Sequence, residues 1–331
     1  MSEVSFTQIV QRGCGIDIHR DEAVATIGGE GLKTETCGYK TFSSSLTELK
    51  EWLIENGVTH VAMESTGVYW KLVYKVLECR ELTVWIVNAR HIKYVLGHKT
   101  DKKDSAWICK LLLAGLLKPS YIPPREQRQL RDLTRYRTKL IQQIAFEKNR
   151  VIRILEDCNI KLDSVLSSTS GVVASKLINK LIDNGKVTMA DIDEVYHRRL
   201  AASKDLIYMA CEGFIEEHHA FMLNKIRKSM EHTREVIAEI SKRIRQLLSP
   251  YDNVVELLRE VPGLNTKTVE DLIAEIGLDM FQFPSEKHLA SWSGMCPGNN
   301  ESAGKKKLTH QPWKQTSQSS LDRSCLGSYP N

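Results

Sequence analysis

Four acidic side chains in the N-terminal part of the chain have types and surroundings that suit metal binding. Asp17 stands inside the apolar run GIDIH, where a charge is costly unless something compensates it. Glu64 follows the apolar run HVAM, and Asp101 and Asp104 lie three residues apart at the start of a predicted helix, where they share one helix face. Such a cluster repels itself unless cations occupy it, and hard oxygen ligands select Mg²⁺ or Mn²⁺. These acids therefore predict a metal site for phosphodiester chemistry.

Each acid also has a simpler interpretation. Asp101 and Asp104 suit the N-terminal turn of a helix, and Glu64 suits a turn. Asp17 is the hardest to dismiss, because neither capping nor solvent exposure explains an acid between two isoleucines in a strand. Basic residues beside the acids would either hold a phosphate backbone against the metal or lie solvated at the surface. They are Lys99, Lys102 and Lys103.

The elements that must position these acids alternate between strand-like and helix-like runs. The predicted order is three strands, helix, strand, helix, strand and helix, which indicates an α/β domain with a partly parallel sheet covered by helices. Sites in such sheets gather at the carboxyl ends of strands, so the four acids can converge. The strands are expected at 15–19, 23–27, 34–39, 58–63 and 82–87, and the helices at 46–56, 68–79 and 102–117.

Beyond a proline-containing linker at residues 120–124 the pattern becomes helical. Apolar residues keep an alternating three-four spacing from Leu130 to Ile154 and again from Ile226 to Leu247. The spacing predicts a coiled coil or two amphipathic helices of one bundle, packed on each other or on a second copy of the chain. Residues 159–217 are helical but irregular.

Basic residues and one glycine turn in this helical part are candidate nucleic-acid contacts. The helix from residue 125 to 153 is rich in arginine, which suits a phosphate backbone or a solvated coiled-coil face. Its candidate contacts are Arg128, Arg131 and Arg135. Gly263, in VPGL between two helical runs, is typical of a helix-hairpin-helix turn that aims N–H groups at a phosphate, or of a simple turn.

Composition restricts the class of protein without naming it. The 331 residues carry a net charge of +5 and are 42% hydrophobic, which fits a globular protein of two or three domains with a nucleic-acid partner allowed but not required. No apolar run approaches the roughly 20 residues of a membrane span, and the N-terminus lacks a signal-peptide pattern. The eight cysteines form no C-x-x-C pair. We therefore expect a cytoplasmic protein with reduced cysteines.

Three motifs carry a resemblance to a known family. GIDIH, AMESTGVYW and KTDKKDS resemble, in this order, the D-E-D-D signature of insertion-sequence family one-ten transposases. The N-terminal domain of that family is similar to Holliday-junction resolvases of the ribonuclease-H fold. The resemblance covers residues 13–307 and implies that the metal ligands are Asp17, Glu64, Asp101 and Asp104.

A second stretch, LASWSGMCPGNNESAGKKK, resembles the C-terminal segment of the same family. By that resemblance Ser302, expected in a glycine-flanked loop, is the serine that attacks DNA and forms a phosphoserine link. Lys305 and Lys306 would bind phosphate beside it. Serine is a poor nucleophile unless a base or metal activates it, and the N-terminal acids would supply that activation if the domains meet.

The resemblance implies a DNA transposase that cuts and rejoins DNA with Mg²⁺ and this serine. It also implies a guide RNA and a homo-oligomer, a dimer or tetramer, as partners. A site-specific DNA invertase shares the same motifs. An inactive nucleic-acid-binding remnant and a junction resolvase that cuts without joining are further alternatives.

The sequence predicts four segments. Residues 1–120 form the catalytic domain, 121–249 the helical region, and 250–307 the C-terminal transposase domain. From Leu308 the chain lacks the helix with which the family continues. We therefore expect residues 308–331 to be an atypical tail, truncated or frameshifted, and the activity of this copy to be impaired.

Overall fold

The computed structural model describes residues 9–65, 67–88, 104–293, 300–302 and 305–307. The chain forms two compact units, residues 1–122 and residues 123–331, which are described separately. The tail expected to be atypical, residues 308–331, lies outside the described residues.

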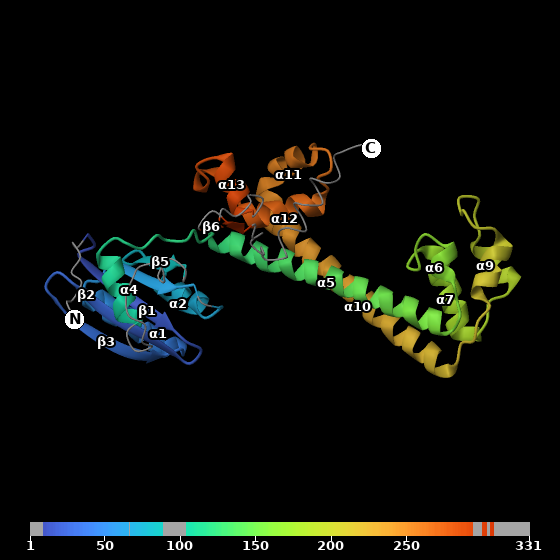
Figure 1. The fold of residues 1–331 in the computed structure, drawn as a ribbon, viewed down its shortest axis with the longest axis horizontal. Helices are drawn as coiled ribbons and strands as arrows, with labels where there is room; N and C mark the ends of the chain where they lie inside the picture. Colours follow the sequence, from blue (N-terminus) through green and yellow to red (C-terminus); the bar gives the residue numbers. More distant parts are fainter. Residues whose placement is uncertain (1–8, 66, 89–103, 294–299, 303–304, 308–331) are drawn as a thin grey trace. The chain divides into compact units, whose positions relative to one another are not determined.

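The first unit is built on a five-stranded mixed sheet (Figure 1). The strand order is β3-β2-β1-β4-β5. The first three strands form an antiparallel meander, and β4 and β5 run parallel to β1. The strands are β1 (Arg12–Ile18), β2 (Glu22–Gly29), β3 (Leu32–Lys40), β4 (His60–Glu64) and β5 (Thr83–Val87).

Helices cover both faces of this sheet. Successive side chains of a strand point to opposite faces, so Val61 and Met63 pack into the core that holds α1 (Ser43–Glu55) and α2 (Trp70–Leu77). Between them, Ala62 joins a second core with α4 (Asp104–Leu113). The predicted α/β, ribonuclease-H-like fold class is confirmed, with helix ends that differ by a few residues from those expected.

The second unit is organised around two long helices, α5 (Arg125–Asp157) and α10 (Glu217–Leu248), which run side by side (Figure 1). The predicted seam of α10 is largely buried, including Ile226, Met230 and Ile244. The two apolar runs therefore pack on each other within one chain. At one end, four short helices close a separate core. They are α6 (Leu162–Val165), α7 (Val172–Asn184), α8 (Met189–Val195) and α9 (Lys204–Cys211).

At the other end of the long pair, α12 (Thr266–Ile276) packs on α5 through a core that includes Leu130, Ile244 and Ile273. The described residues of this unit also form η1 (Ser249–Tyr251), α11 (Asp252–Arg259), η2 (Met280–Gln282), α13 (Glu286–Trp292) and the hairpin of β6 (Asn300–Ser302) with β7 (Lys305–Lys307). No helix among the described residues is both long and apolar enough to cross a membrane.

Candidate active site

Asp17 and Glu64 lie at the carboxyl ends of two neighbouring parallel strands. The register of β1 with β4 runs from Gly13 opposite His60 to Ile16 opposite Met63, and the two acids are the next residue of each strand. Ile16 and Met63 belong to the core under α1 and α2. Because successive side chains of a strand point to opposite faces, Asp17 and Glu64 lie on the other face of the sheet, which α4 covers.

Asp104 is brought to the same place because α4 begins directly above β1. The helix lies so close that a Cβ added to Gly15 would lie 2.2 Å from the backbone oxygen of Ser105 and 2.3 Å from the backbone nitrogen of Cys109. Only a residue without a side chain permits this approach. Gly15 stands two residues before Asp17 on the same face, so the glycine sets the start of α4 beside the acid.

A chain of hydroxyl groups anchors the first turn of α4. Thr26 Oγ1 lies 2.8 Å from Ser105 Oγ and 2.9 Å from Thr36 Oγ1, and both Thr26 and Ser105 are buried. These hydrogen bonds tie the residue next to Asp104 to β2 and β3. The sequence pattern does not indicate this support, because Thr26 resembles any other residue of a strand and its partner is 79 positions away.

The electrostatics of Asp17 reflect this crowding. Burial raises the pKa of the Asp17 carboxyl, and the negative charges of Asp104 and Glu64 raise it further. His19 acts against them, with its Nε2 lying 3.2 Å from Asp17 Oδ2. Three of the four predicted acids therefore interact at one edge of the sheet, and a neighbouring imidazole offsets part of their repulsion.

The donor set at this edge suits a hard divalent cation. A cation would stabilise carboxylates whose negative charges act on Asp17 as those of Glu64 and Asp104 do, and oxygen ligands suit Mg²⁺ or Mn²⁺. As placed, no three His, Cys, Asp or Glu side chains of the described residues are close enough together to hold a metal ion. The fourth predicted acid and the three lysines beside it lie outside the described residues. They are Asp101, Lys99, Lys102 and Lys103.

Two of the arginines predicted to contact nucleic acid form hydrogen bonds with α12. Arg131 Nε donates to the backbone oxygen of Ala274 at 2.9 Å. Arg135 donates two hydrogen bonds of 2.7 Å to the carboxylate of Glu275, which raises the pKa of the arginine. Both guanidinium groups thus hold the end of α12 against α5, a structural role that the sequence pattern did not indicate. Arg128, on the same helix, is partly buried.

Arg137 has a role that its position in an apolar seam concealed. It is 2% exposed and pairs with both Glu270 and Asp271 of α12, with Arg137 Nη2 lying 2.7 Å from Asp271 Oδ1. Burial raises the pKa of the Asp271 carboxyl, and the charge of Arg137 opposes that rise. The local pattern around this arginine does not indicate these contacts, since its partners stand 133 and 134 positions away.

Of the two C-terminal candidates, one lies in a turn between helices and the other in a short strand. Gly263 has a φ of 89° in the connection between α11 and α12, a conformation that favours glycine. Asn265 then caps α12, with its Oδ1 accepting from the backbone N–H of Thr268 at 2.9 Å. Ser302 was expected in a loop, but its backbone ends strand β6 and pairs with Lys305 of β7. Glu301 pairs with Lys306 in the same hairpin.

The first unit therefore belongs to a recognisable class. A mixed five-stranded sheet with helices on both faces, and with acids at the ends of its central parallel strands, defines a ribonuclease-H-like domain.

Comparison with known proteins gives the family. Residues 14–160 match the DEDD transposase domain of the IS110 type, described as "Transposase", and residues 255–320 match the model described as "Transposase IS116/IS110/IS902 family". The chain belongs to the IS110 family of transposases, and membership implies DNA transposase or recombinase activity. The second match extends to residue 320, beyond Lys307, where the sequence analysis placed the end of the likeness.

The chain is also similar to two named proteins. The chain is similar to the "Pilin gene-inverting protein" of Moraxella bovis, with 31% identity over 277 residues that cover 81% of this chain and 67% of the relative. It is also similar to the "Pilin gene-inverting protein" of Moraxella lacunata, with 22% identity over the same coverage.

Proposed function

We propose that this protein is the DNA transposase of an insertion sequence and that it cuts and rejoins DNA at the acidic edge of its first unit. The observation that carries the proposal is the electrostatic interaction of Asp17 with Glu64 and Asp104, three acids from separate elements. A structural role does not explain why the chain would place these repelling charges together.

The proposed cofactor is Mg²⁺ or Mn²⁺, held by Asp17, Glu64, Asp101 and Asp104. Bound there, it would supply positive charge that polarises the phosphodiester and stabilises the leaving oxygen. The chain's own contribution is to hold the carboxylates in place. For Asp104 this is done by Gly15 and by the hydrogen bond between Thr26 and Ser105.

Ser302 is the proposed nucleophile. Its hydroxyl would lose a proton to a base, its oxygen would bond to phosphorus, and one ester oxygen of the strand would leave as a hydroxyl end. The pairing of Ser302 with Lys305 supports this role, because the serine stands in a hairpin whose second strand consists of lysines, which suit a phosphate.

The proposed partners are DNA, a guide RNA and further copies of this chain in a dimer or tetramer. The proposed DNA contacts are Lys99, Lys102, Lys103, Arg128, Gly263, Lys305 and Lys306. Arg131 and Arg135 would act indirectly, because they position α12. The catalytic domain (1–120), the helical region (121–249) and the transposase domain (250–307) would contribute the acids, the framework and the serine, respectively.

Strand cleavage of element-end DNA by the full chain tests this proposal. With Mg²⁺ and the element's own transcript, the protein should nick and rejoin the DNA, and Asp17→Ala should abolish nicking. Asp21→Asn is the matched control, because this acid follows the same strand but its side chain is 85% exposed. Tight binding without any cleavage by the unaltered chain would instead indicate an inactive remnant.

The serine step has its own test in the same assay. Ser302→Ala should abolish both rejoining and the covalent protein–DNA adduct, which is detected as a DNA label that stays with the denatured protein. If Ser302→Ala still recombines DNA at the normal rate, the proposed nucleophile is wrong even when the metal site is correct.

Site-specific DNA inversion is a second candidate function, favoured by the names of the two relatives. The two functions differ in what happens to a segment between two recognised sites. A plasmid with the sites in inverted orientation should yield inverted segments if the protein is an invertase. Excised elements or new insertions would support transposition.

A further inference from the structure

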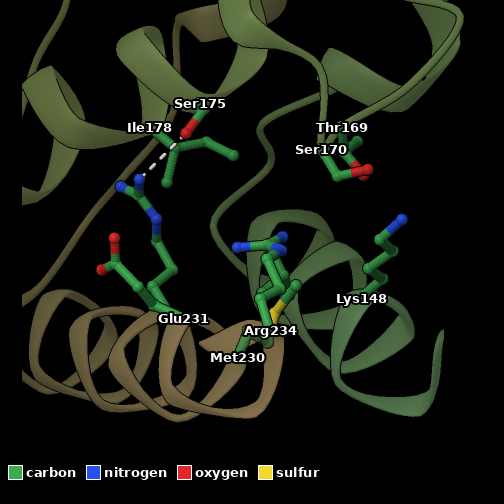
Figure 2. Close-up of a pocket in the computed structure, with 10 residues that line it drawn as sticks. Lys148, Thr169, Ser170, Ser175, Ile178, Met230, Glu231 and Arg234 are labelled. Atoms are coloured by element: carbon green, nitrogen blue, oxygen red, sulfur yellow. Dashed lines mark hydrogen bonds between the residues drawn. The ribbon is translucent and has the colours of Figure 1, made fainter. Parts of the chain in front are cut away.

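A polar pocket lies in the second unit, far along the chain from the acids. It occupies about 160 Å³ between α5, α10 and the start of α7. Figure 2 shows Lys148 of α5 and Arg234 of α10 extending toward the loop that carries Thr169 and Ser170. Neither the acidic site nor the serine hairpin accounts for this pocket.

Positive charge dominates the lining of the pocket. Lys148, Arg227 and Arg234 face it, with Glu231 as the carboxylate among the lining residues. Within the part of the chain that the structure describes, neither Lys148 nor Arg234 has an ion-pair partner. Burial lowers the pKa of the Arg227 guanidinium, Glu231 opposes this effect, and the charge of Arg234 lowers that pKa further. Two arginines that repel each other beside a lysine would be stabilised by an anion.

Hydroxyl groups lie around these cations. Arg227 donates to Ser175 Oγ at 2.9 Å, the dashed line in Figure 2, and this bond fixes the guanidinium at the pocket wall. Thr169 and Ser170 add two hydroxyl groups. They stand just before Gly171, the N-cap residue of α7, a helix of 13 residues that has no side-chain cap. A helix N-terminus attracts negative charge, so it adds to the effect of the three cations.

A second hollow, of about 380 Å³, adjoins the pocket at the same loop. It shares Lys148, Thr169 and Ser170 with the pocket and adds Asn149 and the hydroxyl of Ser168, with Asp163 as its acidic member. Ser168 Oγ lies 3.0 Å from Ser170 Oγ, so the loop between the two hollows is internally bonded. Two adjoining hollows that share a lysine and two hydroxyl groups suit a chain with repeated phosphates better than a single small anion.

We propose that these two hollows, with Lys148, Arg227 and Arg234 as the cations, form a binding site for the phosphodiester backbone of a nucleic-acid strand. The site holds the strand at the end of the helical pair that carries α7. It uses no metal and no residue of the proposed active site, so it can be tested independently of the proposed function.

Binding of short labelled single strands by the full chain, measured by fluorescence anisotropy in EDTA, tests the proposal. DNA and RNA strands of the same sequence form the two arms. The double variant Lys148→Gln/Arg234→Gln should weaken binding about tenfold in at least one arm. It should also lower the slope of log K against log salt by about 1.4, since each phosphate contact on a single strand contributes about 0.7.

The matched control is Arg243→Gln, an exposed arginine of the same helix that does not line either hollow. A loss in the DNA arm, the RNA arm or both supports the site and identifies the strand that it holds. Unchanged binding in both arms overturns the proposal, and so does an equal loss with Arg243→Gln, which would indicate an effect of general surface charge.

Equal melting temperatures of the three proteins would show that the substitutions left the fold intact. The absence of divalent ions separates this outcome from any failure of the cleavage assay.

Discussion

Asp17 carries a charge on a strand whose neighbouring side chains are buried among apolar groups. Its carboxylate is 17% exposed and has one partner of potentially opposite charge, His19, against two like charges, Asp104 and Glu64. Burial and like charge both favour the protonated form. The sequence alone indicates that this residue is unusual, because an acid between two isoleucines needs compensation. The neighbours that act on it become visible only in the folded chain.

At the residue scale, Asp17→Asn should stabilise the metal-free protein at neutral pH. The raised pKa means that the folded state binds the proton more tightly than the unfolded state. The stability of the unaltered protein therefore falls as pH rises above about 3.9 and through the folded pKa, and the variant does not share this fall. Melting temperatures across this range in EDTA measure the effect. An Asp17→Asn protein that melts no higher than the unaltered chain near neutral pH contradicts it, and Asp21→Asn should change little.

At the scale of elements, the approach of α4 to β1 positions the active site. A side chain at Gly15 would displace the helix that begins at Asp104, because it would meet the helix backbone and not a flexible side chain. Gly15→Ala should therefore cost about 1–3 kcal/mol of unfolding free energy and reduce cleavage. Gly28→Ala on β2 is the control, since its Cβ would meet Cys109 Sγ at an ordinary 3.5 Å. Urea unfolding measures the unfolding free energy of both variants. An equal loss of stability in Gly15→Ala and Gly28→Ala would contradict the role assigned to Gly15.

The second unit depends on a buried ion network between α5 and α12. Arg137 is shared by Glu270 and Asp271, and all three are buried. Arg137→Met should destabilise the protein by about 3–5 kcal/mol, because it leaves two carboxylates buried without their cation. Arg150, whose side chain is 65% exposed and pairs with Glu147, provides the control, and Arg150→Met should cost less than about 1 kcal/mol.

A rescue experiment separates charge from packing in this network. Adding Glu270→Gln and Asp271→Asn to Arg137→Met removes the uncompensated charges and should restore much of the lost stability in urea unfolding. If the triple variant is as unstable as Arg137→Met alone, the shape of the arginine matters and not its charge.

On the scale of the whole molecule, apolar periodicity predicted the strands and the first long helix to within a few residues, whereas α10 begins at Glu217, well before the predicted run from Ile226. It did so because local pattern determines local structure, as in the seam of α10. The acids were predicted from their types and motifs. Their supports were not, because Thr26, Ser105 and the partners of Arg137 act through contacts across a long stretch of chain. The polar pocket between α5, α10 and the start of α7 was not predicted for the same reason, since its cations come from two helices separated in sequence.

The central claim is that the acids at the edge of the sheet act together in metal-assisted cleavage of a phosphodiester. The most direct measurement is the Mg²⁺-dependent nicking rate of element-end DNA for the full chain, Asp17→Asn, Glu64→Gln, Asp104→Asn and Asp21→Asn. The account predicts that each of the first three variants loses about 100-fold or more, since even groups one step removed from a metal contribute about 10–100-fold. Asp21→Asn should keep the normal rate. Nicking that persists at the normal rate in Asp17→Asn would contradict the account.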